Sequence, residues 1–445
     1  MWGIFHVGFR HGHCKWPETS LYGLTVLRFK PLCYMNCTLA SLFRNLLTGL
    51  LMAFLIQVLS SPQAHATHAM GADLTYACLG GDTYEFTLTF YRDCSPGAAP
   101  ASASYPLTIS SASCGQLAII VLNQVGTSVD ISPLCPADKP NSTCNGGALP
   151  GVEQYTYKGT YTFPQNCADW VMQWENFCRN GAITNSVIST IATETVIRAT
   201  LDNLSVSCNN SPTFTTIPVP YVCAGQEYFF NHGAYDADGD SLAFELIDPL
   251  EKDVAAGIPV LYSPGFSPAY PISTTPANSF NFDPLTGQMN FRPAAIQNGI
   301  VALLVKQYRN GVLIGTTMRD IQLVVLNCNN IPPVISPPAN VSGGTLTGNT
   351  FSVCAGNTLS FNFTANDLNA GDLLTAASSI STTIPGATIS LSGTNPVSGT
   401  VTWATTLANV GTRHFTITVA DNACPISASQ VIGFAIAVHD QVEIL

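Results

Sequence analysis

The sequence VCAG stands at residues 222–225 and again at 353–356, and three further pairs of similar segments occur around it in the same order. SCNNSP at 207–212 parallels NCNNIP at 327–332, DADGDSL at 236–242 parallels NDLNAGDLL at 366–374, and TGQMNF at 286–291 parallels SGTVTW at 398–403. Four matches in one order indicate an internal repeat. Each repeat has about the length of an immunoglobulin-like sandwich, roughly 100 residues.

The residues between these motifs alternate between apolar and polar types, which is typical of strands with one buried face. Clear examples are 84–91, 302–308, 321–326 and 414–419. The stretch 167–178 is expected to form one or two helical turns. We therefore predict an all-β protein of tandem antiparallel β-sandwich domains, Ig-like or cadherin-like, at 67–207 (Cys-rich), 208–330 and 331–445, with the Asn-Asn-x-Pro segments as linkers.

An export signal precedes the repeats. A short apolar run at 46–59 follows Arg44 and is followed by Ala64-His65-Ala66, a small-residue cleavage signature. We expect cleavage between Ala66 and Thr67, so that residues 1–66 are an N-terminal extension with a signal peptide, translated from Met1 or from Met35. The alternative is a retained membrane anchor, but the run is short for a bilayer span. The mature chain is predicted to have no stable transmembrane span and to be secreted or at a bacterial cell surface.

Charge and cysteine content fit this compartment. The formal net charge is −11, which argues against a nucleic-acid partner. Twelve of the fifteen cysteines follow residue 66, and none has CxxC spacing, so disulfides are favoured over a zinc site. We predict the bridges Cys208–Cys223 and Cys328–Cys354, each closing the start of a repeat. Seven cysteines in 67–207 and one in the last unit leave one or two thiols unpaired, unless the array folds back.

Several motifs resemble a known family. THAMGADLTY at 67–76, YRDC at 91–94, and YRNGVLIG at 308–315 with RDIQ at 319–322 resemble large exported Bacteroidetes proteins described as gliding-motility-associated or PKD-domain-containing. The resemblance implies a cell-surface protein, exported by type IX secretion across the cell outer membrane and attached there by a C-terminal sorting domain. No such domain follows residue 445 here, so we expect a truncated product. The D-x-D after a proline linker is also similar to cadherin-like repeats.

Two acidic loops are candidate calcium sites. Asp236, Asp238 and Asp240 lie in a Gly-containing loop, where alternate carboxylates can converge on a hard cation. The alternative is a solvated Asp/Gly turn, because no Glu completes an EF-hand pattern. In the second repeat, Asp367 and Asp372 stand farther apart in the sequence.

Catalytic signals are weak. Glu153, Asp169 and Glu175 are candidate carboxylates for glycoside hydrolysis, and the aromatic residues at 155–177 form either a sugar-stacking platform or a core. His232, expected in a loop, and His414, expected in a strand, have no positioned catalytic partner. We predict a non-enzyme: an adhesin-like or spacer array, linked to gliding motility, whose partners are surface glycans or other surface proteins. The alternative is a carbohydrate-binding or glycan-hydrolysing protein whose activity resides in 67–207.

Overall fold

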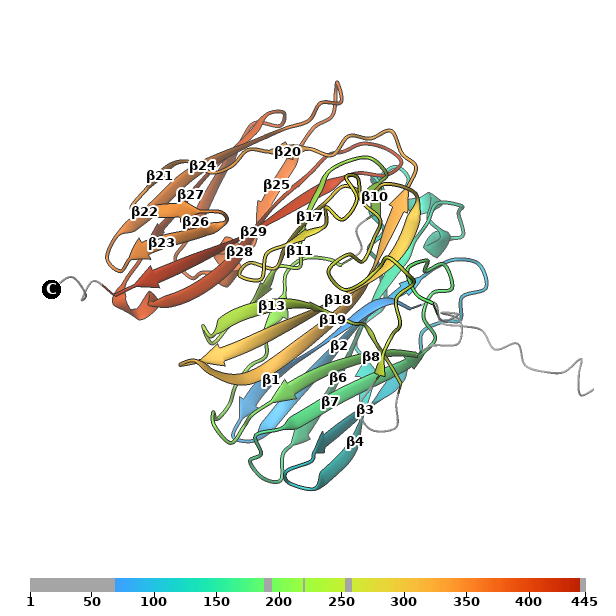
Figure 1. Ribbon diagram of the computed structural model, residues 1–445, viewed down its shortest axis with the longest axis vertical. Helices are drawn as coiled ribbons and strands as arrows, with labels where there is room; N and C mark the ends of the chain where they lie inside the picture. Colours follow the sequence, from blue (N-terminus) through green and yellow to red (C-terminus); the bar gives the residue numbers. More distant parts are fainter. Residues whose placement is uncertain (1–68, 188–193, 219–220, 253–257, 441–445) are drawn as a thin grey trace, which may run out of the picture. The chain divides into compact units, whose positions relative to one another are not determined.

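The computed structural model describes residues 69–187, 194–218, 221–252 and 258–440. The predicted signal segment and the Ala66–Thr67 cleavage site lie outside these ranges. Within them, no helix has the length and apolar character needed to cross a bilayer. The described chain is almost entirely strand, as predicted (Figure 1).

A sheet of fourteen strands runs through residues 69–326. Its strands are β1 (Ala69–Gly80), β2 (Thr83–Asp93), β3 (Ser104–Ser111), β4 (Gln116–Gln124), β5 (Val129–Asp130), β6 (Val152–Thr162), β7 (Trp170–Phe177), β8 (Glu194–Leu201), β10 (Tyr221–Cys223), β13 (Ser241–Ile247), β14 (Leu250–Glu251), β15 (Ile258–Pro259), β18 (Gln297–Arg309) and β19 (Val312–Leu326). Short elements accompany them: η1 (Lys139–Asn141), η2 (Thr143–Asn145), β9 (Thr213–Phe214), β11 (Tyr228–Asn231), β12 (Ala234–Tyr235), β16 (Asn281–Phe282) and β17 (Gln288–Phe291). Strand β7 replaces the helical turns expected at 167–178.

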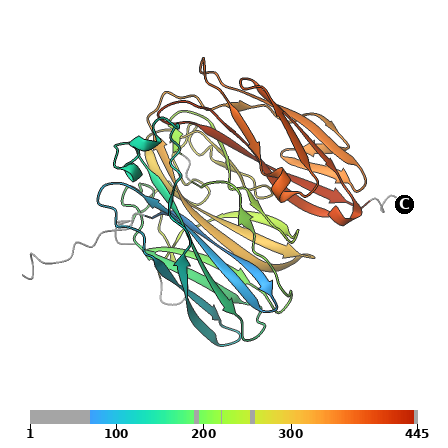
Figure 2. The ribbon, with the colours of Figure 1, turned by 180° about the vertical axis from the view of Figure 1, so that it is seen from behind.

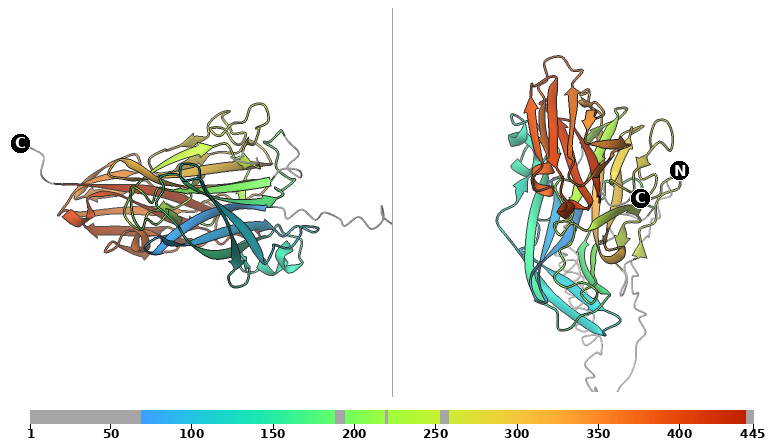
Figure 3. Two further views of the ribbon diagram at one scale, coloured as in Figure 1. Left: turned by 90° about the horizontal axis from the view of Figure 1, so that it is seen from below. Right: turned by 90° about the vertical axis from the view of Figure 1, so that its left-hand side faces the viewer.

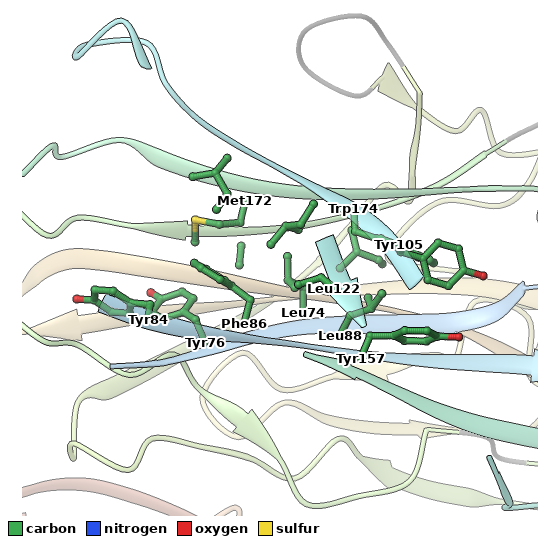
Figure 4. Packing of buried hydrophobic residues seen from close by; sticks show 14 of the residues in the cluster. Leu74, Tyr76, Tyr84, Phe86, Leu88, Tyr105, Leu122, Tyr157, Met172 and Trp174 are labelled. Carbon is green, nitrogen blue, oxygen red and sulfur yellow. The ribbon is translucent and has the colours of Figure 1, made fainter. Parts of the chain in front are cut away.

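Eight strands of this sheet form a closed cycle of pairings, β19–β1–β2–β6–β4–β3–β7–β8, in which β8 returns to β19 (Figure 2). Side chains from β1, β2, β3, β4, β6, β7 and β8 meet in one core, where the alternating residues of β2 and β7 point inward (Figure 4). Trp170 and Trp174 are fully buried in it. Because β18 and β19 belong to the second predicted domain, the boundary at 207/208 falls inside a shared sheet instead of between separate sandwiches.

The junction of these units is the contact between β1 and β19. Asp73 lies opposite Arg319 in the register, and the Arg319 guanidinium lies 2.9 Å from the Asp73 carboxylate, with both side chains almost fully buried. Arg179 pairs with the neighbouring Asp320 at 2.7 Å, again buried. Gly71 comes so close to the Asp320 carbonyl that a Cβ would clash with it. This explains a glycine in the THAMGAD segment.

The C-terminal unit is a two-sheet sandwich (Figure 3). One sheet holds β20 (Val334–Ile335), β21 (Ala339–Ser342), β24 (Thr358–Asn366), β26 (Thr388–Ser392) and β27 (Val397–Ala404); the other holds β22 (Gly344–Thr347), β23 (Thr350–Cys354), β25 (Thr375–Ser378), β28 (Gly411–Ala420) and β29 (Ser429–His439). A single-turn helix, α2 (Ile380–Thr383), and η4 (Leu407–Asn409) lie in its loops. A core that includes Phe351, Phe361 and Trp403 fills the sandwich.

The strand pairings bear out the internal repeat. In both copies the VCAG strand lies parallel to the last strand, β10 beside β19 and β23 beside β29. In both copies the following strand pairs with the TGQ or SGT strand, β11 with β17 and β24 with β27. Likewise β13 pairs with β18, and β25 pairs with β28. Sequence similarity therefore reflects a common topology.

The disulfide pairings differ from the prediction. The bridges are Cys78–Cys208, Cys94–Cys144, Cys114–Cys167, Cys135–Cys424 and Cys223–Cys328, while Cys178 and Cys354 are unpaired. The predicted Cys208–Cys223 and Cys328–Cys354 bridges are wrong because each Cys-Asn-Asn cysteine bonds backward, to the module that precedes it. Cys328, the partner of Cys223, stands two residues after the end of β19. The residue two positions after the end of β29 is Gln441, so the sequence has no cysteine at the equivalent position for Cys354.

One bridge joins distant parts of the chain. Cys135, in the loop after β5, bonds to Cys424, in the loop between β28 and β29. The Cys135 amide also donates to the Pro425 carbonyl at 3.0 Å. The chain thus folds back on itself, and the single cysteine of the last unit, Cys424, is paired. Five disulfides fit a protein that folds in an oxidising, extracytoplasmic compartment.

Candidate functional site

The predicted calcium loop of the first repeat brings its three carboxylates together. Asp236 follows β12, Asp240 precedes β13, and one oxygen from each of these residues and from Asp238 lies within 4.8 Å of the others. Asp236 and Asp240 are buried, whereas Asp238 is exposed. The backbone amide of Asp240 donates to Asp236 Oδ1 at 2.9 Å and so closes the loop.

This cluster already contains a positive charge from the protein itself. Arg309, at the end of β18, donates from Nη2 to Asp240 Oδ2 at 2.7 Å and to Asp238 Oδ2 at 3.3 Å. Gln307, two residues earlier, donates from Nε2 to Asp236 at 2.6 Å and to Asp240 at 2.8 Å. The first repeat therefore satisfies its carboxylates with a guanidinium and an amide, and calcium at Asp236, Asp238 and Asp240 stays a prediction.

The linker completes the first cluster. The amide of Asn210 donates to Asp238 at 2.8 Å, and its side chain donates to the other oxygen of Asp238 at 2.7 Å. Asn209 accepts from Arg309 at 2.9 Å. Burial raises the pKa of Asp236 to about 7, and the charges of Asp240 and Asp238 act in the same direction. The cluster therefore clamps the Cys-Asn-Asn linker onto the repeat that follows it.

The second repeat has a different acidic cluster. Asp367 follows β24, Asp372 lies in the loop before β25, and Asp421 follows β28; one oxygen of each lies within 4.8 Å of the others. Asp367 and Asp372 were predicted from the sequence, whereas Asp421 was not. The signal in the sequence is an Asp directly after the strand that ends at Ala420, and the β25–β28 pairing brings it beside the other two.

Each of the carboxylates proposed for glycoside hydrolysis has partners of its own. Glu153 pairs with Arg92 at 2.7 Å, and Asp169 accepts the Ser113 amide at 2.8 Å. Glu175 lines a cavity of about 290 Å³ together with Glu194 and Lys252. Lys252 lies 3.0 Å from Glu175 and 3.8 Å from Glu194, so the cavity carries both signs of charge.

The aromatic residues of 155–177 mostly belong to the core. Tyr157, Phe163, Trp170 and Trp174 are buried, and Phe163 packs on Trp170 with a centroid distance of 4.6 Å. Phe177 is 51% exposed beside the Glu175 cavity. The core interpretation of this cluster thus describes the packing better than a continuous stacking platform.

The two histidines lie where expected, His232 in a loop and His414 in β28. Both are buried, and burial lowers the pKa of each, that of His414 to about 4. His414 Nε2 lies 3.1 Å from the Leu285 carbonyl, so this ring connects the last sandwich to the loop before β17.

Comparison with known proteins shows no family for this chain. The sequence matches no family model and no curated protein. Among solved structures, an endo-fucoidan hydrolase of glycoside hydrolase family 107 is 14% identical over 72% of this chain, with a TM-score of 0.17; the aligned region spans 39% of that hydrolase. A titin Ig tandem is 7% identical over 52% of this chain and 98% of its own, with a TM-score of 0.16.

A third similar structure comprises domains 4 and 5 of the S-layer protein SbsC, 17% identical over 51% of this chain and 96% of its own, with a TM-score of 0.14. Similarity this slight transfers no activity. The all-β sandwich assignment rests on the strand pairings of the chain itself.

Proposed function

We propose that this chain is an exported, non-enzymatic surface protein that acts as an adhesin-like spacer. The observation that carries the proposal is its covalent construction: bridges close the first unit internally, tie it to the linker at Cys208, and join it to the last sandwich at Cys424. Such cross-links restrict hinge motion and favour a stiff object over one that opens and closes around a substrate. Gliding motility and type IX secretion enter as finer proposals, supported by the family resemblance.

A candidate contact surface lies on β4. Leu117, Ile119 and Val121 alternate along this strand and are 73%, 67% and 54% exposed. Apolar side chains grouped on one exposed strand face are typical of surfaces that bind another protein. This favours a surface protein over a glycan as the partner of this face.

A cell-adhesion assay with the purified chain tests the function. We expect Ile119→Glu to reduce adhesion to cells of the producing strain several-fold, because a charge in an apolar interface must be desolvated. Leu204→Glu, at another position that is exposed (63%), is the matched control and should adhere like wild type. Equal adhesion by both variants would show that β4 is not the contact surface. No adhesion by the wild-type chain would refute the adhesin function.

The second candidate function is glycan binding at the Glu175 cavity. Its support is the grouping of Glu175, Glu194 and Lys252 around a concave site beside an exposed aromatic ring. A glycan array and a turnover assay on the whole chain test it. Binding that is lost in Glu194→Gln, with or without turnover, would favour this function over the spacer.

A further inference from the structure

The acidic cluster of the C-terminal sandwich differs from that of the first repeat at two equivalent positions. In the first repeat, Leu242 lies opposite Gln307 in the β13–β18 register. In the last sandwich the β25–β28 register begins at Thr375 opposite Ala420, so the residue before Thr375 faces Asp421. DGDSL at 238–242 parallels AGDLL at 370–374, so Leu374 corresponds to Leu242. Asp421 lies opposite Leu374 and therefore takes the place of Gln307.

Arg309 stands two residues after Gln307, and the residue two positions after Asp421 is Ala423. Ala423 therefore takes the place of Arg309. The last sandwich has therefore lost both donors that satisfy the first cluster, the amide and the guanidinium, and has gained a carboxylate. Among the residues that the structure describes, no Lys, Arg or His forms an ion pair with Asp367, Asp372 or Asp421. Three carboxylates this close need a counter-charge if all are ionised.

One oxygen of this cluster and one of the neighbouring linker are buried without a hydrogen-bond partner. Asp367 is only 9% exposed, and its Oδ2 accepts no hydrogen bond, whereas its Oδ1 accepts from the Asn369 amide at 2.7 Å. Asn330, in the linker, donates from Nδ2 to Asp421 Oδ2 at 2.8 Å, which leaves its Oδ1 buried and unpartnered. A buried acceptor without a donor is costly, and oxygens of both kinds are ligands that Ca²⁺ prefers.

We propose that Asp367, Asp372 and Asp421 bind one calcium ion, beside the Asn330 amide that donates to Asp421. The geometry excludes an internal substitute of the kind that Arg309 supplies in the first repeat. Calcium accepts six to eight oxygen ligands in flexible geometry, so solvent completes the shell at the half-exposed Asp372.

The ion would stiffen the junction between the last sandwich and the rest of the protein. Its ligands come from the end of β24, from the loop before β25 and from the β28–β29 loop, where Asp421 also accepts a hydrogen bond from Asn330 of the linker. That loop also carries Cys424, which bonds to Cys135. Calcium would therefore hold together the two connections of the sandwich, the linker and the disulfide-bonded loop, and this inference is independent of whether the protein is an adhesin.

Calorimetric titration of the oxidised full chain with CaCl₂, after treatment with EDTA and dialysis, tests the site. We expect one site with a dissociation constant of about 10⁻⁴–10⁻³ M, the range of extracellular modules. Asp421→Asn and Asp372→Asn should each weaken binding roughly tenfold or more, because each removes a charged ligand. Ala423→Arg, which restores the cation of the first repeat, should abolish binding while the chain remains folded by circular dichroism.

Asp82→Asn is the matched control, since it removes one exposed carboxylate that lies outside both acidic clusters, and it should bind calcium like wild type. Wild-type affinity in Asp421→Asn or in folded Ala423→Arg would overturn the proposal. So would loss of binding in Asp82→Asn, or no binding by the wild-type chain at millimolar calcium.

Discussion

Replacing Arg319 by Met should destabilise the protein strongly, because it leaves the Asp73 carboxylate in the β1–β19 junction without its cation. Arg319 donates from Nε to Asp73 at 3.0 Å and from Nη1 to the Thr216 carbonyl at 3.0 Å, and it lies 4.1 Å from the Phe214 ring centroid. Removal of one partner from a buried ion pair costs about 3–5 kcal/mol. We expect a loss of this size in the free energy of unfolding.

Urea denaturation monitored by tryptophan fluorescence measures this loss, since Trp170 and Trp174 lie in the core of the same strand cycle. The double variant Asp73→Leu/Arg319→Met should recover most of it, because replacement of a whole buried pair by apolar residues is often neutral or stabilising.

The exposed pair between Lys158 and Glu85 is the control, with a distance of 2.6 Å and side chains that are 40% and 32% exposed. Lys158→Met should cost about 0.2–1 kcal/mol, as exposed pairs do. The reasoning is refuted if Arg319→Met costs no more than Lys158→Met, or if the double variant is less stable than Arg319→Met alone.

Three further predictions concern the junctions. Replacing Cys135 and Cys424 together by Ser should lower stability by about 2–5 kcal/mol in urea denaturation, since their bridge closes a very long loop; an unchanged midpoint would contradict this. His414 has a folded pKa of about 4, below its unfolded value of 6.5, so its contribution to stability is lost as pH falls from about 6.5 to about 4, and His414→Gln should flatten that part of the pH–stability curve. The pH dependence of stability due to Asp236 has the opposite sign, because its folded pKa of about 7 exceeds its unfolded value of 3.8. The stability of wild type relative to Asp236→Asn should therefore decline as pH rises from about 4 to about 7. An increase in this relative stability would contradict the prediction.

The sequence predicted the elements whose cause is local. Alternation of apolar and polar residues placed β2, β18, β19 and β28, because one face of a strand must be buried and the side-chain period is two. The recurrence of VCAG predicted two copies of one topology, which the parallel pairings of β10 and β23 bear out. The stretch at 167–178 was misassigned because its aromatic residues alternate into a core that belongs to strands distant in sequence.

The acidic clusters show the same division. Sequence spacing sufficed to bring Asp236, Asp238 and Asp240 together, since a short loop holds all three. It could not reveal that Arg309 enters that cluster, or that Asp421 joins Asp367, because both arrive through strand pairing across tens of residues.

By itself, then, the amino-acid sequence determined the strands, the repeat and the abundance of disulfides, all of which follow from local pattern and composition. Only the tertiary structure decided which cysteines bond, that β19 joins two modules in one sheet, and which acidic loop lacks a counter-charge. Those features depend on which strand edges pair. Pairing between strands that are distant in sequence is determined by the burial of whole strand faces, and the residues next to each cysteine or carboxylate do not encode it.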